Sequence, residues 1–325
     1  MAYEARHWVR YKPLTEQYFK LPALAKFQIH TRKYVDKIMS SSKYKQALKL
    51  ASAKLAVSVK RQIYGEVGSL PDFLILGAAK AGTTSLFYYL SQHPNISTPN
   101  RKKEVHYFDL NYNRGIDWYR NHFPQNNKRT LGASGVRNLC FEASPSYMIY
   151  PPALERIKKD IPSVKLIVLL RDPVERAYSH YRHNVRRGRE KLSFRESLEA
   201  ETERTSIKSQ IPGNLKFETI SPGYRHFSYV QTSLYAKTIK NIFEFFDKES
   251  VLLIKSRDLL SNPQLITENV FHFLAVDYLG KNIDFAQKNT GIGTKIENEL
   301  ILKYVKDIFE TDIQNLKTLT GIDLS

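Results

Sequence analysis

The sequence predicts an α/β protein in which helices cover both faces of a central parallel β-sheet. Three short apolar runs, typical of buried strands, occupy residues 73–77 (FLILG), 165–170 (KLIVLL) and 250–256 (SVLLIKS). Segments of helical character alternate with these runs, and this alternation is typical of parallel sheets covered on both faces. Ligands of such sheets bind beyond the carboxyl ends of the strands, so we expect the functional site in the loops that follow them.

Helices are expected beside every predicted strand. The first strand is followed by a helix that closes at a proline. The second is followed by a helix with Pro173 near its start and Gly188 after its end, positions that suit these two residues. The third strand lies between two helices. The four predicted helices are 83–94, 172–188, 232–246 and 262–276.

The chain divides into a basic, mostly helical extension at 1–70 and one domain at 71–325. Residues 1–64 hold 14 Lys or Arg and three acidic residues, a net charge of +11 out of +18 for the whole chain. A helix at 44–64 could lie on an anionic membrane. We favour the alternative, a helix packed on the domain, because its apolar face is thin: Leu48, Ala51, Leu55 and Val59.

Composition limits the classes of partner and compartment. A net charge of +18 favours a polyanionic partner: nucleic acid, anionic lipid, acidic polysaccharide or a highly phosphorylated cofactor. No apolar run approaches the ~20 residues that cross a bilayer, and the first residues lack the apolar core of a signal peptide. Cys140 is the only cysteine, so no intramolecular disulfide can form. These features favour the cytoplasm, with peripheral membrane contact as a second option.

A glycine-bearing loop at 77–85 follows the first predicted strand. Gly77 and Gly82 have the spacing of an ATP- or GTP-binding P-loop, G-x-x-x-x-G-K-[ST]. Thr83 replaces the lysine of that motif, and Lys80 lies inside the loop instead. Backbone amides and the helix N-terminus would still bind an anion. We expect a 5′-phosphate rather than a Mg²⁺-bound triphosphate, held by Lys80, Ala81, Gly82, Thr83, Thr84 and Ser85.

Four segments, in chain order, resemble motifs of one enzyme family. Residues 73–86 resemble the 5′-phosphosulfate loop of the PAPS-dependent sulfotransferases, whose donor is 3′-phosphoadenosine 5′-phosphosulfate (PAPS), and residues 169–188 resemble their 3′-phosphate motif. Residues 102–109 (KKEVHYFD) and 142–147 (EASPSY) resemble the K-E-x-H-F-F and E-K-[ST]-P-x-Y segments of the heparan-sulfate-type branch. The resemblance covers roughly 71–295 and implies a P-loop-type three-layer fold.

The resemblance implies a reaction and a set of donor contacts. A sulfuryl group would pass in line from PAPS to an acceptor, with Lys80 stabilising the charge on the leaving oxygen. The guanidinium of Arg171 and the hydroxyl of Ser179 would bind the 3′-phosphate. A late polar stretch would close over the donor through Lys288 and Asn289. The reaction needs no metal, and we find no metal-ligating cluster in the sequence.

The acceptor must lose a proton, and the resemblance makes Glu104 the base. His106 lies two residues on, so both side chains would share one face if the segment is extended. His106 could share the catalytic role, although we favour orientation of the substrate. A surface ion pair with Lys102 or Lys103 is the alternative for Glu104.

The acceptor is expected to be a carbohydrate, bound through its hydroxyl or amino group. Ala143 replaces the lysine of E-K-[ST]-P, so one cation of the heparan-sulfate-type members is missing. Without their cysteine pair and membrane anchor, the chain resembles a soluble bacterial member. A small-molecule or lipid-linked hydroxyl is the alternative acceptor. We place acceptor contacts in a long loop at 206–226 and at four basic residues: Lys102, Lys103, Arg186 and Arg187.

Two other classes of function compete with this hypothesis. A P-loop nucleotide kinase would need the lysine that the loop lacks at Thr83. A non-catalytic module could bind a polyanion through the basic surface, above all through residues 1–64. No nucleic-acid-binding motif is present, so nucleic acid is not among the expected partners. Arg171 and Asp172 could, in either case, form only a local ion pair at the start of a helix.

Overall fold

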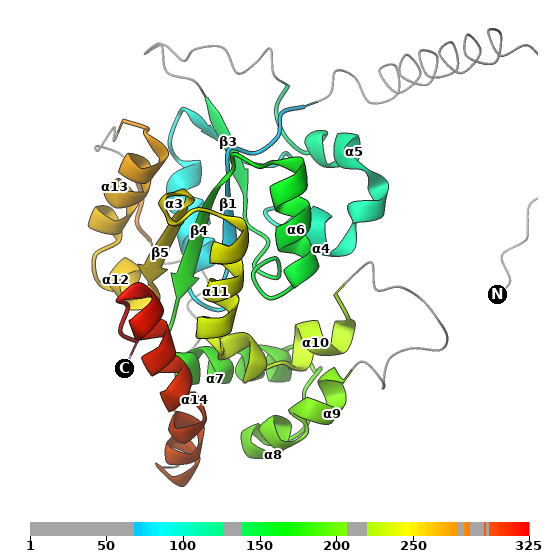
Figure 1. The fold of residues 1–325 in the computed structure, drawn as a ribbon, viewed down its shortest axis with the longest axis vertical. Coiled ribbons are helices and arrows are strands. Elements are labelled where there is room, and N and C mark those ends of the chain that lie inside the picture. The colour runs from blue at the N-terminus through cyan, green and yellow to red at the C-terminus, as the bar shows by residue number, and fades with distance from the viewer. Residues whose placement is uncertain are drawn as a thin grey trace, which may run out of the picture. The chain divides into compact units, whose positions relative to one another are not determined.

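The computed structural model describes residues 68–125, 138–206, 220–277, 283–286, 296 and 299–324. A five-stranded sheet lies at the centre, with the order β2-β3-β1-β4-β5 (Figure 1). Its strands are β1 (Phe73–Gly77), β2 (Ile96–Ser97), β3 (Leu139–Glu142), β4 (Lys165–Leu170) and β5 (Val251–Lys255). The predicted helix at 44–64 and the residues Lys288 and Asn289 lie outside the described residues.

All strand pairs of the sheet are parallel, which confirms the predicted α/β class. Phe73 of β1 pairs with Phe141 of β3 on one side and with Lys165 of β4 on the other. The three predicted strands are β1, β4 and β5, with small differences at their ends. β2 and β3 were not predicted, because a two-residue strand and the short run LCFE carry little periodicity.

Helices cover both faces of the sheet. Figure 1 shows α6 and α11 in front of the strands and α3 behind them. The longer helices are α3 (Thr83–Ser91), α6 (Pro151–Asp160), α7 (Pro173–Arg186), α11 (Tyr235–Phe245), α13 (Pro263–Leu274) and α14 (Glu299–Thr320). The shorter ones are α4 (Tyr107–Leu110), α5 (Ile116–Arg120), α8 (Phe194–Glu199), α9 (Glu201–Thr205), α10 (Pro222–Phe227) and α12 (Ser256–Ser261).

Local sequence explains where the helices begin. The Asp172 carboxylate accepts a hydrogen bond from Glu175 N at 2.8 Å and caps α7, and Pro173 follows in the first turn. The loop predicted for 206–226 is wrong at its end, because α10 begins there at Pro222. Ser221 caps α10 by accepting from Tyr224 N at 3.2 Å. The Ser-Pro pair was the available signal.

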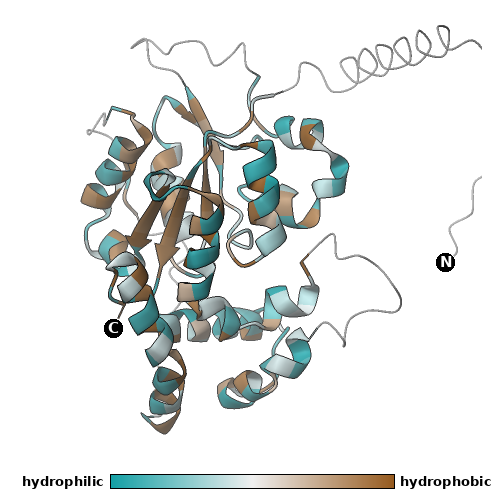
Figure 2. Cartoon of the chain, viewed as in Figure 1, coloured by the Kyte–Doolittle hydropathy of each residue, from teal (hydrophilic) through white to brown (hydrophobic). Residues whose placement is uncertain are grey.

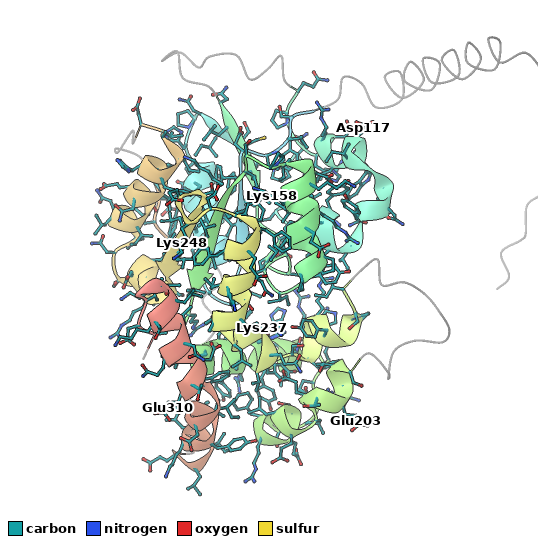
Figure 3. All side chains as sticks on the ribbon, in the orientation of Figure 1. Asp117, Lys158, Glu203, Lys237, Lys248 and Glu310 are labelled. Carbon is teal, nitrogen blue, oxygen red and sulfur yellow. The ribbon has the colours of Figure 1, made fainter. Side chains whose placement is uncertain are left out.

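The strands supply the main hydrophobic core. β1 is completely buried, and Figure 2 shows the strands as the most uniformly apolar elements. Exposed charged residues such as Glu203, Lys237 and Glu310, labelled in Figure 3, come from the surrounding helices α9, α11 and α14. Within the described ranges, no helix has both the length and the apolarity needed to cross a bilayer.

A second, smaller hydrophobic cluster lies apart from the main core. It joins α7, α8 and α14, and its buried members are Val174, Ala177, Phe194, Leu198, Tyr229, Val305 and Phe309. The buried carboxylate of Glu201, on α9, accepts hydrogen bonds from the backbone N–H groups of three consecutive residues just after α10. The helices α8, α9 and α10 therefore form a region supported by its own cluster.

Candidate active site

The loop between β1 and α3 requires backbone conformations that few residues adopt. A Cβ at Gly77 would lie 2.8 Å from Met148 Sδ, so the segment around Met148 leaves room only for glycine at position 77. Gly82, the N-cap residue of α3, has φ +96°. Lys80 has φ +72°, which is unusual for a residue with a side chain. Such positions cluster at functional sites, and here the conformation belongs to the predicted leaving-group residue.

The loop between β4 and α7 meets the first loop directly. Ala78 N donates to Leu169 O at 2.8 Å, and Arg171 Nη1 donates to Lys80 O at 3.2 Å. Arg171 also pairs with Glu175, at 3.0 Å, rather than with its neighbour Asp172. The structure therefore brings Lys80 and Arg171, two residues predicted to bind the sulfuryl donor, to one edge of the sheet.

The Lys80 ammonium lies among other cations. Burial and then the charges of Arg186 and Arg171 lower the pKa of Lys80 to about 8, with smaller contributions from Arg176 and Lys103. Lys80 makes no ion pair with any carboxylate in the part of the chain that the structure describes. Partly buried positive charges that repel one another are arranged to receive an anion.

The positive charge continues along α7 towards its C-terminal end. Burial and then the charges of Lys80, Arg187 and Arg186 lower the pKa of His183 to about 4. The imidazole is therefore neutral near pH 7, and the positive charge comes from the arginines. Arg186 and Arg187, predicted acceptor contacts, are exposed at this end of the helix.

Glu104 and His106 contact each other, as the sequence led us to expect, but for a different reason. The segment is not extended at His106, whose φ of +55° and ψ of +40° are left-handed. Alternation along a strand was therefore the wrong explanation. His106 Nε2 lies 3.1 Å from Glu104 Oε2, and Nδ1 lies 3.0 Å from Asp109 Oδ2. The sequence analysis missed Asp109, although its H-x-x-D spacing from His106 was visible.

The imidazole of His106 carries charge between two carboxylates. Burial alone would lower its pKa, but the hydrogen bonds to Asp109 and Glu104 outweigh burial and raise the pKa to about 9. Burial likewise raises the pKa of Glu104, and the contacts with His106 and Lys103 reverse this and hold it below its usual value. Near pH 7 Glu104 is therefore an ionised carboxylate that faces an imidazolium.

Lys103 connects residues 102–109, here called the Glu104 segment, to the loop at 77–85 between β1 and α3. Its ammonium donates to Thr84 Oγ1 at 3.0 Å and lies 3.5 Å from Glu104 Oε1. The alternative of an ion pair between Glu104 and Lys103 is thus present in the structure. The same lysine reaches α3, so the pair holds Glu104 near the loop that would bind the donor.

A cation that the sequence analysis missed reaches the same place from α10. Arg225 Nη2 lies 3.0 Å from His106 Nε2. An imidazolium has no acceptor atom, so we treat Arg225 as a second cation beside His106 rather than as its hydrogen-bond partner. Ala143, at the position of the expected lysine, is completely buried. Only the three-dimensional structure could show that α10 approaches this point.

The remaining predicted residues have mixed outcomes. Arg176 is 1% exposed and donates to Ser233 Oγ at 2.6 Å and to Tyr229 O at 2.9 Å, so it is an internal residue. Ser179 is half-buried on α7. Among the described residues, no group of three or more His, Cys, Asp or Glu could hold a metal ion.

Comparison with protein families identifies a family that matches most of the chain. The sulfotransferase domain family matches residues 70–304. The membrane-associated sulfotransferase kil1 of Dictyostelium discoideum is 25% identical over 334 residues, which cover 80% of this chain and 67% of that protein.

Two further similarities involve an animal enzyme and a bacterial structure. The human bifunctional heparan sulfate N-deacetylase/N-sulfotransferase 3 is 32% identical over 220 residues, 64% of this chain and 22% of that protein. The chain thus spans about a fifth of its length. The crystal structure of a sulfotransferase from Alicyclobacillus acidocaldarius is 32% identical, has a TM-score of 0.60, and covers 79% of this chain and 98% of its own.

Proposed function

The chain belongs to the sulfotransferase domain family and is a transferase, and from this premise we propose that it transfers the sulfuryl group of PAPS to a carbohydrate. The acceptor group is a hydroxyl or an amine. The observation that carries the proposal is the Lys80 ammonium, which is surrounded by the charges of Arg186, Arg171, Arg176 and Lys103 and forms no ion pair with a carboxylate of the described residues. A donor with several anionic groups would complete that cluster.

Two adjacent loops would hold the two ends of the donor. The 5′-phosphosulfate lies on the β1–α3 loop, and the 3′-phosphate lies on Arg171, just before α7, and on Ser179, about two turns into that helix. Arg171 Nη1 already lies 3.2 Å from Lys80 O, so the two anion sites are adjacent. Lys288 and Asn289 close over the donor in this proposal. The loop contacts are those predicted above: Lys80, Ala81, Gly82, Thr83, Thr84 and Ser85.

The reaction is a single in-line displacement without a metal. The acceptor oxygen or nitrogen attacks sulfur, the bond from sulfur to the 5′-phosphate oxygen breaks, and the acceptor proton passes to Glu104. The products are the sulfated acceptor and 3′-phosphoadenosine 5′-phosphate. Lys80 stabilises the negative charge on the leaving oxygen. His106, held between Glu104 and Asp109, orients the base and stabilises its ionised form.

The proposed carbohydrate acceptor rests on the relatives and on surface charge. Several relatives are named for sulfation of heparan sulfate. Basic side chains beside Glu104 and at the end of α7 suit an acceptor that bears acidic groups: Lys102, Lys103 and Arg225 in the first place, Arg186 and Arg187 in the second. A small-molecule or lipid-linked hydroxyl is the alternative acceptor.

We also propose that residues 1–70 form an extension to the catalytic domain at 71–325. Its positive charge would hold the enzyme near an anionic membrane or polyanion, at the cytoplasmic side. One relative is named as membrane-associated. If the helix at 44–64 packs on the domain, which the sequence favours, the extension is structural, and only its exposed lysines would contribute to such attraction.

A transfer assay with radiolabelled PAPS and a panel of acceptors tests the proposal. The panel contains heparan sulfate, desulfated heparan sulfate, neutral oligosaccharides and small alcohols. We expect transfer to a carbohydrate, and weak use of adenosine 5′-phosphosulfate, which lacks the 3′-phosphate. Equal use of both donors would contradict the role of Arg171, and transfer only to small alcohols would contradict the acceptor class.

A further inference from the structure

A buried carboxylate lies directly under the Glu104 segment. Glu142, at the end of β3, is completely buried and accepts four hydrogen bonds. Its Oε1 accepts from the hydroxyls of Tyr119 and Tyr147, each at 2.8 Å. Its Oε2 accepts from Ser144 Oγ at 2.6 Å and from Val105 N at 3.0 Å. The two oxygens of a carboxylate can accept four hydrogen bonds, so all of its acceptor positions are in use.

Two of these donor hydroxyls also accept a hydrogen bond from the backbone close to Glu104. Ser144 Oγ accepts from His106 N at 3.1 Å, and the Tyr147 hydroxyl accepts from Tyr107 N at 2.7 Å. Each hydroxyl has one proton, and because it receives an N–H it must direct that proton to Glu142. Together with Val105 N, three consecutive backbone N–H groups therefore end on Glu142, directly or through one hydroxyl.

This arrangement fixes the only left-handed residue of the segment. A left-handed conformation is unfavourable in a residue with a side chain, and it persists only where its surroundings determine it. His106 is held on its N–H by Ser144 Oγ and on its carbonyl by Asn111 Nδ2, at 2.9 Å. The turn at His106 directs the imidazole to Glu104 and Asp109. Without the backbone hydrogen bonds to Ser144 and Asn111, the ring would no longer be held against these two carboxylates.

We propose that Glu142 is a positioning residue for the catalytic base, acting through the hydroxyls of Ser144 and Tyr147 on the backbone of residues 105–107. Its role is to hold the His106 imidazole against Glu104 and so to set the geometry and acidity of the base. The proposal rests on the base role that the proposed function gives to Glu104.

The chain offers a matched pair of variants. Tyr119 and Tyr147 are both completely buried, and each donates to Glu142 Oε1 at the same distance. Tyr147 alone of the two also accepts from the Glu104 segment, at Tyr107 N. Tyr119→Phe and Tyr147→Phe therefore each remove one hydrogen bond to Glu142 Oε1. Only Tyr147→Phe also removes the hydrogen bond from Tyr107 N, which lies in the Glu104 segment. Ser144→Ala breaks the parallel connection at His106 N.

The first measurement is the rate of sulfuryl transfer with PAPS. A displacement of about 1 Å at a reacting group can cost roughly 100-fold in rate. We expect Tyr147→Phe and Ser144→Ala to lower kcat by about 10- to 100-fold and to leave the Kd for 3′-phosphoadenosine 5′-phosphate within about twofold. Tyr119→Phe should keep kcat within about twofold of wild type. The acid limb of kcat should move to higher pH in Tyr147→Phe and Ser144→Ala, because the His106 contact that holds the pKa of Glu104 low is weakened.

The second measurement is independent of sulfuryl transfer. NMR titration of His106 should give a pKa near 9 in wild type and Tyr119→Phe, and a lower value in Tyr147→Phe and Ser144→Ala. Failure of the proposed function, with no transfer to any acceptor, would leave this titration intact as a test. The positioning role is overturned if Tyr119→Phe and Tyr147→Phe lose the same rate, or if neither Tyr147→Phe nor Ser144→Ala moves the His106 titration. If Tyr147→Phe does not fold, Ser144→Ala decides alone.

Discussion

The two halves of the candidate site treat charge in opposite ways. Around Lys80, positive charges accumulate without a carboxylate beside the ammonium, and repulsion contributes to the low pKa of that lysine. Around His106, a positive charge lies between two carboxylates, and the pKa of the imidazole rises to about 9. The first region is incomplete without an anionic ligand, whereas the second is neutralised by the protein itself. Under the proposed function, this difference predicts that donor binding and proton transfer can be disturbed separately.

The largest expected effect is the loss of turnover when Glu104, in the region around His106, is replaced. Glu104→Gln keeps the shape of the side chain and removes the base, so turnover should fall by roughly two to four orders of magnitude. The Kd for 3′-phosphoadenosine 5′-phosphate, measured by calorimetry, should hardly change. Glu203→Gln removes an exposed carboxylate of α9 and is the control. A Glu104→Gln enzyme with a normal rate would move the base role to His106 or to water.

Loss of Lys80 should have the next largest effect. Its charge is needed most as the leaving oxygen becomes anionic, so Lys80→Ala should lower kcat by about two to three orders of magnitude. The Kd for the donor should rise much less. Lys102→Ala removes an exposed lysine near Glu104 and shows what loss of general positive charge does. A variant that loses affinity but keeps kcat would make Lys80 a binding residue only.

Arg171→Ala should mainly weaken binding of the 3′-phosphate. A hydrogen bond to a charged group contributes about 1.5–3 kcal/mol, which corresponds to a loss of roughly 10- to 100-fold in affinity for the bisphosphate. Binding of adenosine 5′-phosphate should change little. The control is Arg195→Ala, since Arg195 forms the same kind of pair with Glu199 that Arg171 forms with Glu175. If affinity for 3′-phosphoadenosine 5′-phosphate and for adenosine 5′-phosphate fell equally, Arg171 would not be the residue that binds the 3′-phosphate.

The donor site should also respond to pH. Because the pKa of Lys80 is about 8, its charge is present below that pH and is lost above it. Affinity for 3′-phosphoadenosine 5′-phosphate should therefore fall between pH 7 and pH 9 by up to about tenfold, the contribution of one charged hydrogen bond. The phosphates are already ionised over most of this range. Lys80→Ala should flatten the profile, and an unchanged slope would assign the pH dependence to another group.

The smallest effect on chemistry should come from the basic extension. Replacing Lys45, Lys49, Lys54 and Lys60 by glutamine should leave turnover of a neutral oligosaccharide unchanged. Binding to vesicles that contain anionic lipid should weaken and become less sensitive to salt, because screened attraction acts over only about 8 Å at physiological ionic strength. Unchanged vesicle binding would favour a helix that packs on the domain.

The strands predicted from local apolar runs and the family predicted from the motifs were confirmed. Apolar runs identified β1, β4 and β5, and the motifs in chain order identified a sulfotransferase. The sequence could not show β2, which has only two residues, or the left-handed turn at His106. Alternation predicted the right contact between Glu104 and His106 for the wrong reason, because a turn and a strand can both bring residues i and i+2 together.

Contacts between distant segments were beyond the sequence. Arg225 lies more than 100 residues from His106 along the chain, and nothing in its local sequence marks it as a neighbour. The motif at 142–147 drew attention to the segment of Glu142, but not to the hydrogen bond between Glu142 and Val105 N. Lys288, Asn289 and the extension remain predictions. Composition could indicate that the surface is basic, but it could not separate the cations that face one another from those paired with carboxylates.

The separate small cluster that joins α7, α8 and α14 has a consequence for the history of such a chain. Its members Val174 and Ala177 belong to α7, the helix that also carries Ser179 and Arg186, whereas Glu104 depends on the central sheet and its loops. Mutations that remodel this cluster would therefore act on α7 as well as on the neighbouring helices. We expect descendants of this chain that change their acceptor through this region to change their affinity for the 3′-phosphate as well.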